Sequence, residues 1–121
     1  MSSFAERLAR VQARIASAQA RSRHRAEVTL VAVSKTQPPE NVRALYTAGQ
    51  RHFGENYAQE LVRKVDALAD LEDASFHFIG HLQSRKAKQV LPYVSLVHSV
   101  ESMSLVEELD RRSGAEVRVL L

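Results

Sequence analysis

The sequence predicts an α/β fold in which short parallel strands alternate with helices. Five short, mostly apolar runs recur at intervals of about 18–24 residues, and a stretch with helical apolar spacing lies between each neighbouring pair. The runs lack the polar alternation of a strand with one wet face, which indicates that both faces are covered. An open doubly wound sheet and the first half of a TIM-type (β/α)8 barrel both fit this pattern.

Before the first strand, residues 3–25 are predicted to form an amphipathic helix. Its apolar residues are spaced by four, three, four and three positions: Phe4, Leu8, Val11, Ile15 and Ala18. Residues 1–25 carry six arginines against one glutamate, a balance of +5, whereas the rest of the chain has eleven Lys/Arg against thirteen Asp/Glu, a balance of −2. A surface helix packed on the body is the simplest interpretation. A nucleic-acid or membrane-surface binder and a mitochondrial transit peptide are the alternatives.

The remaining elements follow in order along the chain. The strand-like runs occupy residues 28–34, 52–56, 76–80, 94–100 and 117–121. The helical patterns between them place apolar residues three and four apart: Val42, Leu45 and Tyr46; Leu61, Val65 and Leu68; Ala87, Val90 and Leu91; and Leu105, Val106 and Leu109. Pro38 and Pro39 precede the first of these helices, and Gly49 ends it.

Capping residues mark the two later helices. Ser84 is predicted to cap the third one. In the fourth, Ser104 and Glu107 have the spacing of a capping box, and Gly114 is the predicted stop.

The composition is that of one ordinary globular domain. The 121 residues are 45% hydrophobic and 26% charged, and a chain of this length forms one domain at most. The absence of cysteine excludes disulfides, thiolate catalysis and cysteine-ligated metal. It also fits a reducing compartment, and we expect a cytoplasmic protein. No apolar run approaches the ~18 residues of a membrane span, and we expect no signal peptide.

Polar residues gather where the predicted strands end, which is where parallel α/β folds bind ligands. They are Ser34, Lys35, Glu55, Asn56, Tyr57, Gly80, His81, Gln83, His98 and Ser99. Part of this polarity follows simply from chain segments leaving the sheet for water. A dinucleotide site is disfavoured, because residues 35–38 read Lys-Thr-Gln-Pro where a Gly-rich phosphate loop would lie.

Lys35 directly follows the first apolar strand. A lysine at the partly desolvated mouth of a closed sheet favours its neutral amine, because burial disfavours the ammonium ion. A neutral amine forms Schiff bases with carbonyl compounds, among them pyridoxal phosphate. The alternative is a solvated lysine, or one that forms a salt bridge with Glu55.

Three sequence motifs occur in order along the chain: VAVSKT at 31–36, AGQRHFGENYAQE at 48–60 and FHFIGHLQSRKAK at 76–88. Together they resemble the pyridoxal-phosphate-binding homeostasis proteins of the YggS/PROSC type, which are related to the N-terminal barrel domain of alanine racemase. The resemblance covers residues 3–121. It implies the first half of a TIM-type barrel, with about five parallel strands after an N-terminal helix.

The resemblance also implies a site. Lys35 would carry pyridoxal 5'-phosphate as a Schiff base, Asn56 would lie near the cofactor, and residues 79–83 would line the same rim. The family is roughly twice as long as this chain. The groups that hold the phosphate and the pyridine nitrogen would therefore lie beyond Leu121. We expect residues 1–121 to be a single incomplete barrel domain, with its β/α units at 28–121, from a fragment or a truncated gene product.

The resemblance favours a carrier that binds the cofactor for homeostasis, possesses no catalytic residue and serves pyridoxal-phosphate-dependent apoenzymes. Binding to nucleic acid or a membrane is not part of this prediction. A low-level amino-acid racemase is the enzymatic alternative, and it would need an acid–base group opposite the lysine. Tyr46 and Tyr57 are the nearby phenols, but Tyr46 fits a core position. No metal site is predicted, because the histidines at 52, 77, 81 and 98 lack the i, i+4 spacing of a helical pair.

Overall fold

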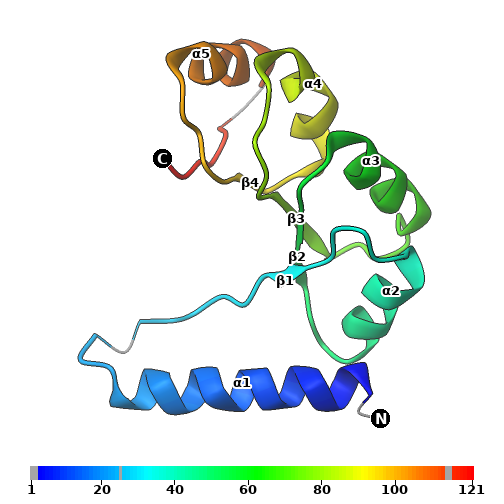
Figure 1. Ribbon diagram of the computed structural model, residues 1–121, viewed down its shortest axis with the longest axis vertical. Helices are drawn as coiled ribbons and strands as arrows, with labels where there is room; N and C mark the ends of the chain where they lie inside the picture. The colour runs from blue at the N-terminus through cyan, green and yellow to red at the C-terminus, as the bar shows by residue number, and fades with distance from the viewer. Residues whose placement is uncertain (1–2, 25, 114–115) are drawn as a thin grey trace.

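The computed structural model describes residues 3–24, 26–113 and 116–121, and it shows a curved row of parallel strands with helices along one side (Figure 1). The four strands pair in chain order, and every pairing is parallel. They are β1 (Ala32–Val33), β2 (His52–Glu55), β3 (Ser75–Phe78) and β4 (Leu96–Val97). A single parallel bridge joins Val97 to Val119, so the predicted fifth strand lies beside β4 but forms only this one bridge.

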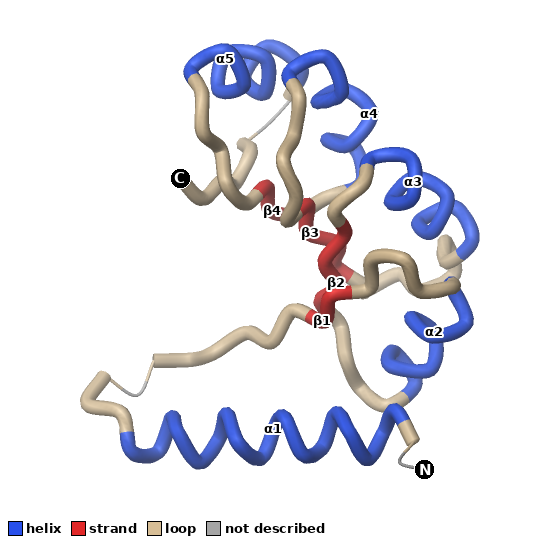
Figure 2. Tube along the Cα trace, in the orientation of Figure 1, coloured by secondary structure: helices blue, strands red, loops and turns tan. Residues whose placement is uncertain are grey.

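Helices connect the successive strands and form an outer layer, as Figure 2 shows in blue against the red strands. The helices are α1 (Phe4–Arg21), α2 (Pro39–Thr47), α3 (Ala58–Ala67), α4 (Ala87–Val90) and α5 (Met103–Arg112). Two 3₁₀ turns flank α4: η1 (Ser84–Lys86) and η2 (Leu91–Tyr93). The alternation of strands and helices predicted from the sequence is confirmed.

The strands are shorter than predicted. Of the run 28–34 only Ala32–Val33 forms a regular strand, and of the run 94–100 only Leu96–Val97 does. The reason for β1 is its place at the end of the strand order, where among the described strands it has β2 as its one neighbour. An apolar sequence predicts an extended conformation, whereas a strand also needs a neighbouring backbone to pair with.

Two helix caps differ from the prediction. The N-cap of α5 is Ser102, whose Oγ accepts a hydrogen bond from the Leu105 N–H at 3.1 Å, so the predicted capping box is wrong. Ser104 instead lies inside the helix, where its Oγ is 3.0 Å from the Oγ of Ser84. Ser84 does not cap α4 either, because it begins η1. Gly114 lies outside the described residues.

The start and end of α2 are as predicted. Pro39 occupies the first turn, where its missing N–H costs no hydrogen bond. Beyond the helix, Gly49 has a φ of 111°, a conformation that favours glycine, and its N–H donates to the Tyr46 carbonyl at 2.9 Å.

The hydrophobic core lies between the outer face of the sheet and the helices. Alternate strand residues, including Phe53, Phe76, Phe78 and Val97, are buried there with apolar residues of α2–α5. The inner face is more open, since Val33 on β1 is 55% exposed. The apolar runs predicted two covered faces, but within the described residues helices cover only the outer one.

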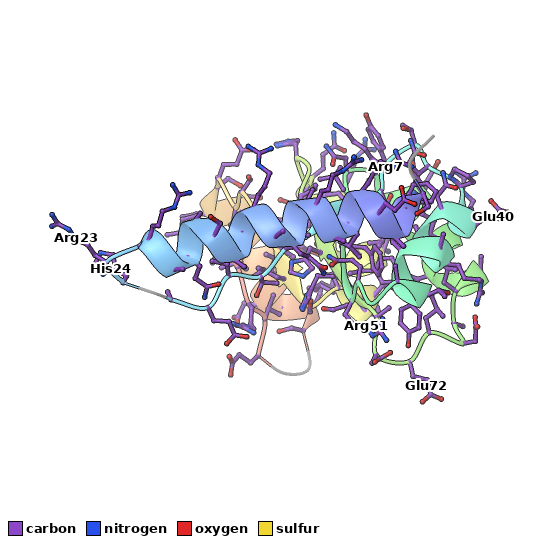
Figure 3. All side chains as sticks on the ribbon, turned by 90° about the horizontal axis from the view of Figure 1, so that it is seen from below. Arg7, Arg23, His24, Glu40, Arg51 and Glu72 are labelled. Atoms are coloured by element: carbon purple, nitrogen blue, oxygen red, sulfur yellow. The ribbon has the colours of Figure 1, made fainter. Side chains whose placement is uncertain are left out.

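Helix α1 lies along one end of the sheet and contacts α2 (Figure 1). It ends at Arg21 rather than near residue 25, and residues 26–31 lead to β1. Leu8 is its buried residue, whereas Val11 is 44% exposed. Arg23 and His24 lie at the opposite end of the helix from Glu40 (Figure 3). The expected packing of this helix on the body is therefore confirmed for its first turns.

None of the helices in the described ranges is sufficiently long and apolar for a membrane span.

The two faces of the sheet predict different mutational costs. Replacing Phe53, which is fully buried, with alanine should lower the free energy of unfolding by about 3–5 kcal/mol through cavity formation. Replacing the exposed Val33 with alanine should cost less than about 0.5 kcal/mol. Urea unfolding of both variants measures this. Equal losses would show that the inner face is covered in solution.

Candidate functional site

The carboxyl ends of neighbouring strands bring the predicted site residues to one rim. The β ladder continues past the strands, since the Ser34 N–H donates to the Gly54 carbonyl at 3.0 Å and the Ile79 N–H to the Glu55 carbonyl at 2.9 Å. Lys35 and Asn56 therefore follow directly on two paired strands. The structure thus places the two predicted cofactor-binding residues at the ends of adjacent strands.

Lys35 lies on a tight turn that spans residues 34–37. The Gln37 N–H donates to the Ser34 carbonyl at 3.1 Å and closes the turn. Thr36, the third residue of the turn, has a φ of 63°. A β-branched residue rarely adopts a positive φ, so surrounding contacts must hold this conformation.

The environment of Lys35 differs from the prediction in two respects. The side chain is exposed rather than desolvated, because the inner face of the sheet is open in the described residues. The alternative of a salt bridge between Lys35 and Glu55 is also wrong. The partner of Glu55 is Lys64 on α3, at 2.9 Å.

A buried network of charges lies beneath the Lys35 turn. The carboxylate of Glu55 is fully buried, and the Lys64 ammonium donates to both of its oxygens, at 2.9 and 3.2 Å. Lys64 also donates to Glu60 at 2.8 Å and to the carbonyl oxygen of Ser34. The Ser34 hydroxyl donates to Glu55, and the Thr36 N–H donates to Glu60. The network therefore joins β1, β2 and α3.

The two carboxyl groups of the network have opposite pKa shifts. Burial raises the pKa of Glu55 above its ordinary value of 4.5, and the hydrogen bonds from Ser34 and Lys64 offset this only in part. Burial also acts to raise the pKa of Glu60, but the hydrogen bonds from Lys64 and the Thr36 N–H outweigh it, so this pKa is lowered. The Glu60 carboxylate is therefore the more stable anion of the two.

Lys64 was not among the residues predicted from the sequence, although its position on the helix carries a signal. Lys64 lies on the apolar face of α3, three residues after Leu61 and four before Leu68, both of which are buried. Glu60 precedes it by four residues, which is the spacing of a helical ion pair. A lysine on an apolar helical face, with a carboxylate one turn earlier, indicates a buried ion pair.

Asn56 lies at a pocket of about 320 Å³ in the rim. Its Oδ1 is buried and has no hydrogen-bond partner among the described residues. Gly80 contacts the backbone of Asn56 so closely that an added Cβ would lie 2.5 Å from its carbonyl oxygen. The other residues that line the pocket are Tyr57, Ala58, Gln59, Phe78, His81, Leu82, Gln83, Arg85 and Lys86. The predicted segment 79–83 thus lies beside Asn56, and the free acceptor suits a hydrogen-bond donor from a ligand.

The inner face carries a row of three histidines that sequence spacing did not predict. His52 Nδ1 and His77 Nε2 are 3.0 Å apart, and His77 Nδ1 and His98 Nε2 are 3.1 Å apart. Burial, together with the neighbouring His52, His98 and Arg118, lowers the pKa of His77 to about 4. Within the described chain, no group of three potential ligands has an arrangement that could hold a metal ion. The helical criterion overlooked this row because adjacent strands, and not helix turns, align the rings.

Of the two candidate phenols, Tyr57 lines the rim pocket and Tyr46 does not. Tyr46 packs against the hydrophobic core, as predicted, and its hydroxyl donates to Asp73.

The buried network predicts a pH-dependent stability loss. Lys64→Met should leave Glu55 buried without its cation and lower the free energy of unfolding by about 3–5 kcal/mol at neutral pH. Without Lys64 the pKa of Glu55 rises further, so the folded state binds a proton more tightly than the unfolded one. The loss should therefore shrink as the pH falls towards 4.5.

Chemical denaturation between neutral pH and about pH 5 measures this effect. Arg63→Met, on the exposed face of the same helix, is the control and should change little. A Lys64→Met loss that is independent of pH would contradict the buried pairing.

The histidine row predicts that the folding stability of the unaltered protein declines as the pH falls. Because the folded-state pKa of His77 is about 4 rather than 6.5, folding stability is full above pH 6.5 and declines as the pH falls towards 4. The decline should amount to roughly 2–3 kcal/mol. His77→Gln should flatten this slope, whereas the exposed His81→Gln should not. Denaturation curves across this pH range test it, and an unchanged slope in His77→Gln would refute it.

Comparisons with known proteins were made for the whole chain, and no family model matches it. The pyridoxal phosphate homeostasis protein of Pseudomonas aeruginosa is 45% identical over 116 residues, which are 95% of this chain and 50% of the relative. The protein of the same name from Escherichia coli K12 is 38% identical over 120 residues, 97% of this chain and 51% of the relative. The chain spans about half the length of the curated relatives it matches.

Solved structures agree with this relationship. PipY of Synechococcus elongatus PCC7942, solved with PLP bound, has a TM-score of 0.77 and 40% identity, over 90% of this chain and 47% of PipY. A crystal structure of an unknown protein from Bifidobacterium adolescentis has a TM-score of 0.88 and 36% identity, over 98% of this chain and 53% of that one. The predicted fold class, the first half of a TIM-type barrel after an N-terminal helix, is confirmed. Over nearly all of its length the chain is therefore similar to pyridoxal phosphate homeostasis proteins, about half of whose length it covers.

Proposed function

We propose that this chain binds pyridoxal 5'-phosphate covalently through Lys35 and acts in intracellular homeostasis of the cofactor. The observation that carries the proposal is the position of Lys35, whose exposed side chain lies on a tight turn at the carboxyl end of a strand. The relative PipY, which was solved with PLP bound, supports it. So do the curated relatives, which are named as homeostasis proteins for this cofactor.

The chemistry needs only an accessible amine at a fixed place. The Lys35 nitrogen adds to the aldehyde carbon of the cofactor, a C=N bond replaces the C=O bond, and the oxygen leaves as water. The resulting Schiff base is reversible, which suits a protein that stores and releases its ligand. Asn56 would lie beside the bound molecule, since it lines the neighbouring pocket of the rim.

The rim residues fit covalent attachment of the cofactor to Lys35 better than they fit binding of its phosphate group. A phosphate needs several backbone N–H groups or a helix N-terminus that converge on it. We propose that residues outside the described strands complete that part, and that residues 1–121 contribute the lysine side of a single barrel domain. Arg85 and Lys86 line the neighbouring pocket and add positive charge to the rim.

We favour a carrier over an enzyme. Amino-acid racemisation requires an acid–base group placed opposite the lysine, and the curated relatives carry names for homeostasis rather than catalysis. The recipients of the cofactor would then be pyridoxal-phosphate-dependent apoenzymes of the cytoplasm, and neither nucleic acid nor a membrane enters the function. A low-level racemase is the alternative, and the activity assay below distinguishes it from a carrier.

The test combines trapping with an activity assay on the intact protein. Incubation with pyridoxal 5'-phosphate, borohydride reduction and peptide mass analysis should place the adduct on Lys35, and Lys35→Ala should abolish it. Lys86→Ala and Lys88→Ala are the matched controls and should keep the adduct. An adduct on either of these lysines, with Lys35→Ala still labelled, would refute the assignment.

The same preparations should not sustain racemisation of single-enantiomer alanine or serine above the background of the free cofactor. Turnover that disappears in Lys35→Ala would establish the racemase instead of the carrier.

A further inference from the structure

We propose that Glu55, Glu60 and Lys64 are positioning residues that hold the Lys35 turn in its strained conformation and so present the lysine amine to its ligand. The proposal deepens the proposed function, on which its ligand-binding half rests. The holding of the turn is a property of the protein alone and can be measured without any cofactor.

The network contacts the turn on both sides of Lys35. Before the lysine, Lys64 donates to the Ser34 carbonyl, and the Ser34 hydroxyl donates to Glu55. After it, the Thr36 N–H donates to Glu60. The backbone next to Lys35 is therefore fixed in both directions, while the lysine side chain itself remains exposed.

The turn needs this support because of Thr36. Its φ of 63° lies in the left-handed region, which a β-branched residue adopts only when other contacts compensate. The Gln37 N–H bond to Ser34 closes the turn, but such a bond also forms in turns without a positive φ. The hydrogen bond from the Thr36 N–H to Glu60 is the contact that acts on the strained residue directly.

Stability alone is a poor explanation for the network. Removing two charges from water costs several kcal/mol per ion, and an apolar pair of similar volume is often equally stable. Here the side chain of Lys64 is 4% exposed and that of Glu55 is fully buried. The ions also satisfy backbone groups of the turn, which an apolar pair cannot do. A fixed backbone position for Lys35 is what this arrangement provides.

Glu60 is the residue to vary, because its side chain is 18% exposed and its removal leaves the Glu55–Lys64 pair intact. Glu60→Ala should make the Thr36 amide exchange hydrogen faster. It should also slow the labelling of Lys35 by pyridoxal 5'-phosphate and borohydride by about tenfold, the factor expected for losing one hydrogen bond to a charged group. Glu60→Gln keeps an acceptor oxygen, so its labelling rate should lie between those of Glu60→Ala and the unaltered protein. Glu40→Ala removes a glutamate from the first turn of the neighbouring α2 and is the matched control.

A second substitution separates positioning from a general structural role. Thr36→Gly removes the strain, because glycine adopts a positive φ without cost. Combined with Glu60→Ala, it should restore most of the labelling rate, although it creates no new contact. Thermal unfolding of each variant establishes that the protein compared is folded.

The outcomes distinguish this proposal from the proposed function. Labelling of Lys35 at the same rate in Glu60→Ala and the unaltered protein would overturn the positioning role, as would an unprotected Thr36 amide in the unaltered protein. A slower rate that Thr36→Gly does not restore would overturn the role of strain. If Lys35 is never labelled but Glu60→Ala still releases the Thr36 amide, the cofactor-binding function fails and the holding of the turn stands.

Discussion

The buried contact between Lys64 and Glu55 is the constraint on which the rim of this protein depends. A cation and an anion so far from water are tolerated only when their remaining hydrogen-bonding capacity is satisfied. Lys64 donates to Glu55, to Glu60 and to the Ser34 carbonyl, so the pair ties α3 to the ends of β1 and β2. The position of Lys35 follows from these contacts, because its neighbours in the chain are the groups that the network binds.

The two faces of the sheet have different roles. The outer face, with Phe53 and Phe78, packs against the helices and supplies the hydrophobic core. The inner face carries Val33, the histidine row and the approach to Lys35, and it is the more open side of the described structure.

The comparisons and the local geometry address different questions. The relatives are named for pyridoxal phosphate homeostasis, whereas the structure shows how the backbone on both sides of Lys35 is held. A turn held by buried charges fixes the backbone beside Lys35 and leaves the lysine side chain exposed. That combination suits reversible covalent binding, in which the lysine has to be both accessible and fixed.

The sequence by itself determined the order of strands and helices, the parallel sheet and the location of Lys35 and Asn56 at the ends of neighbouring strands. These follow from local periodicity and from motif phrases that are contiguous in the chain. The tertiary structure alone decided the partner of Glu55, the exposure of Lys35 and the alignment of His52, His77 and His98. The histidine row joins residues 25 and 21 positions apart, and the Glu55–Lys64 pair joins a strand to the helix that follows it. The exposure of Lys35 depends on which face of the sheet is covered. Periodicity along one segment carries no information about which neighbouring segment will lie against it, and burial and ion pairing are set by that neighbour.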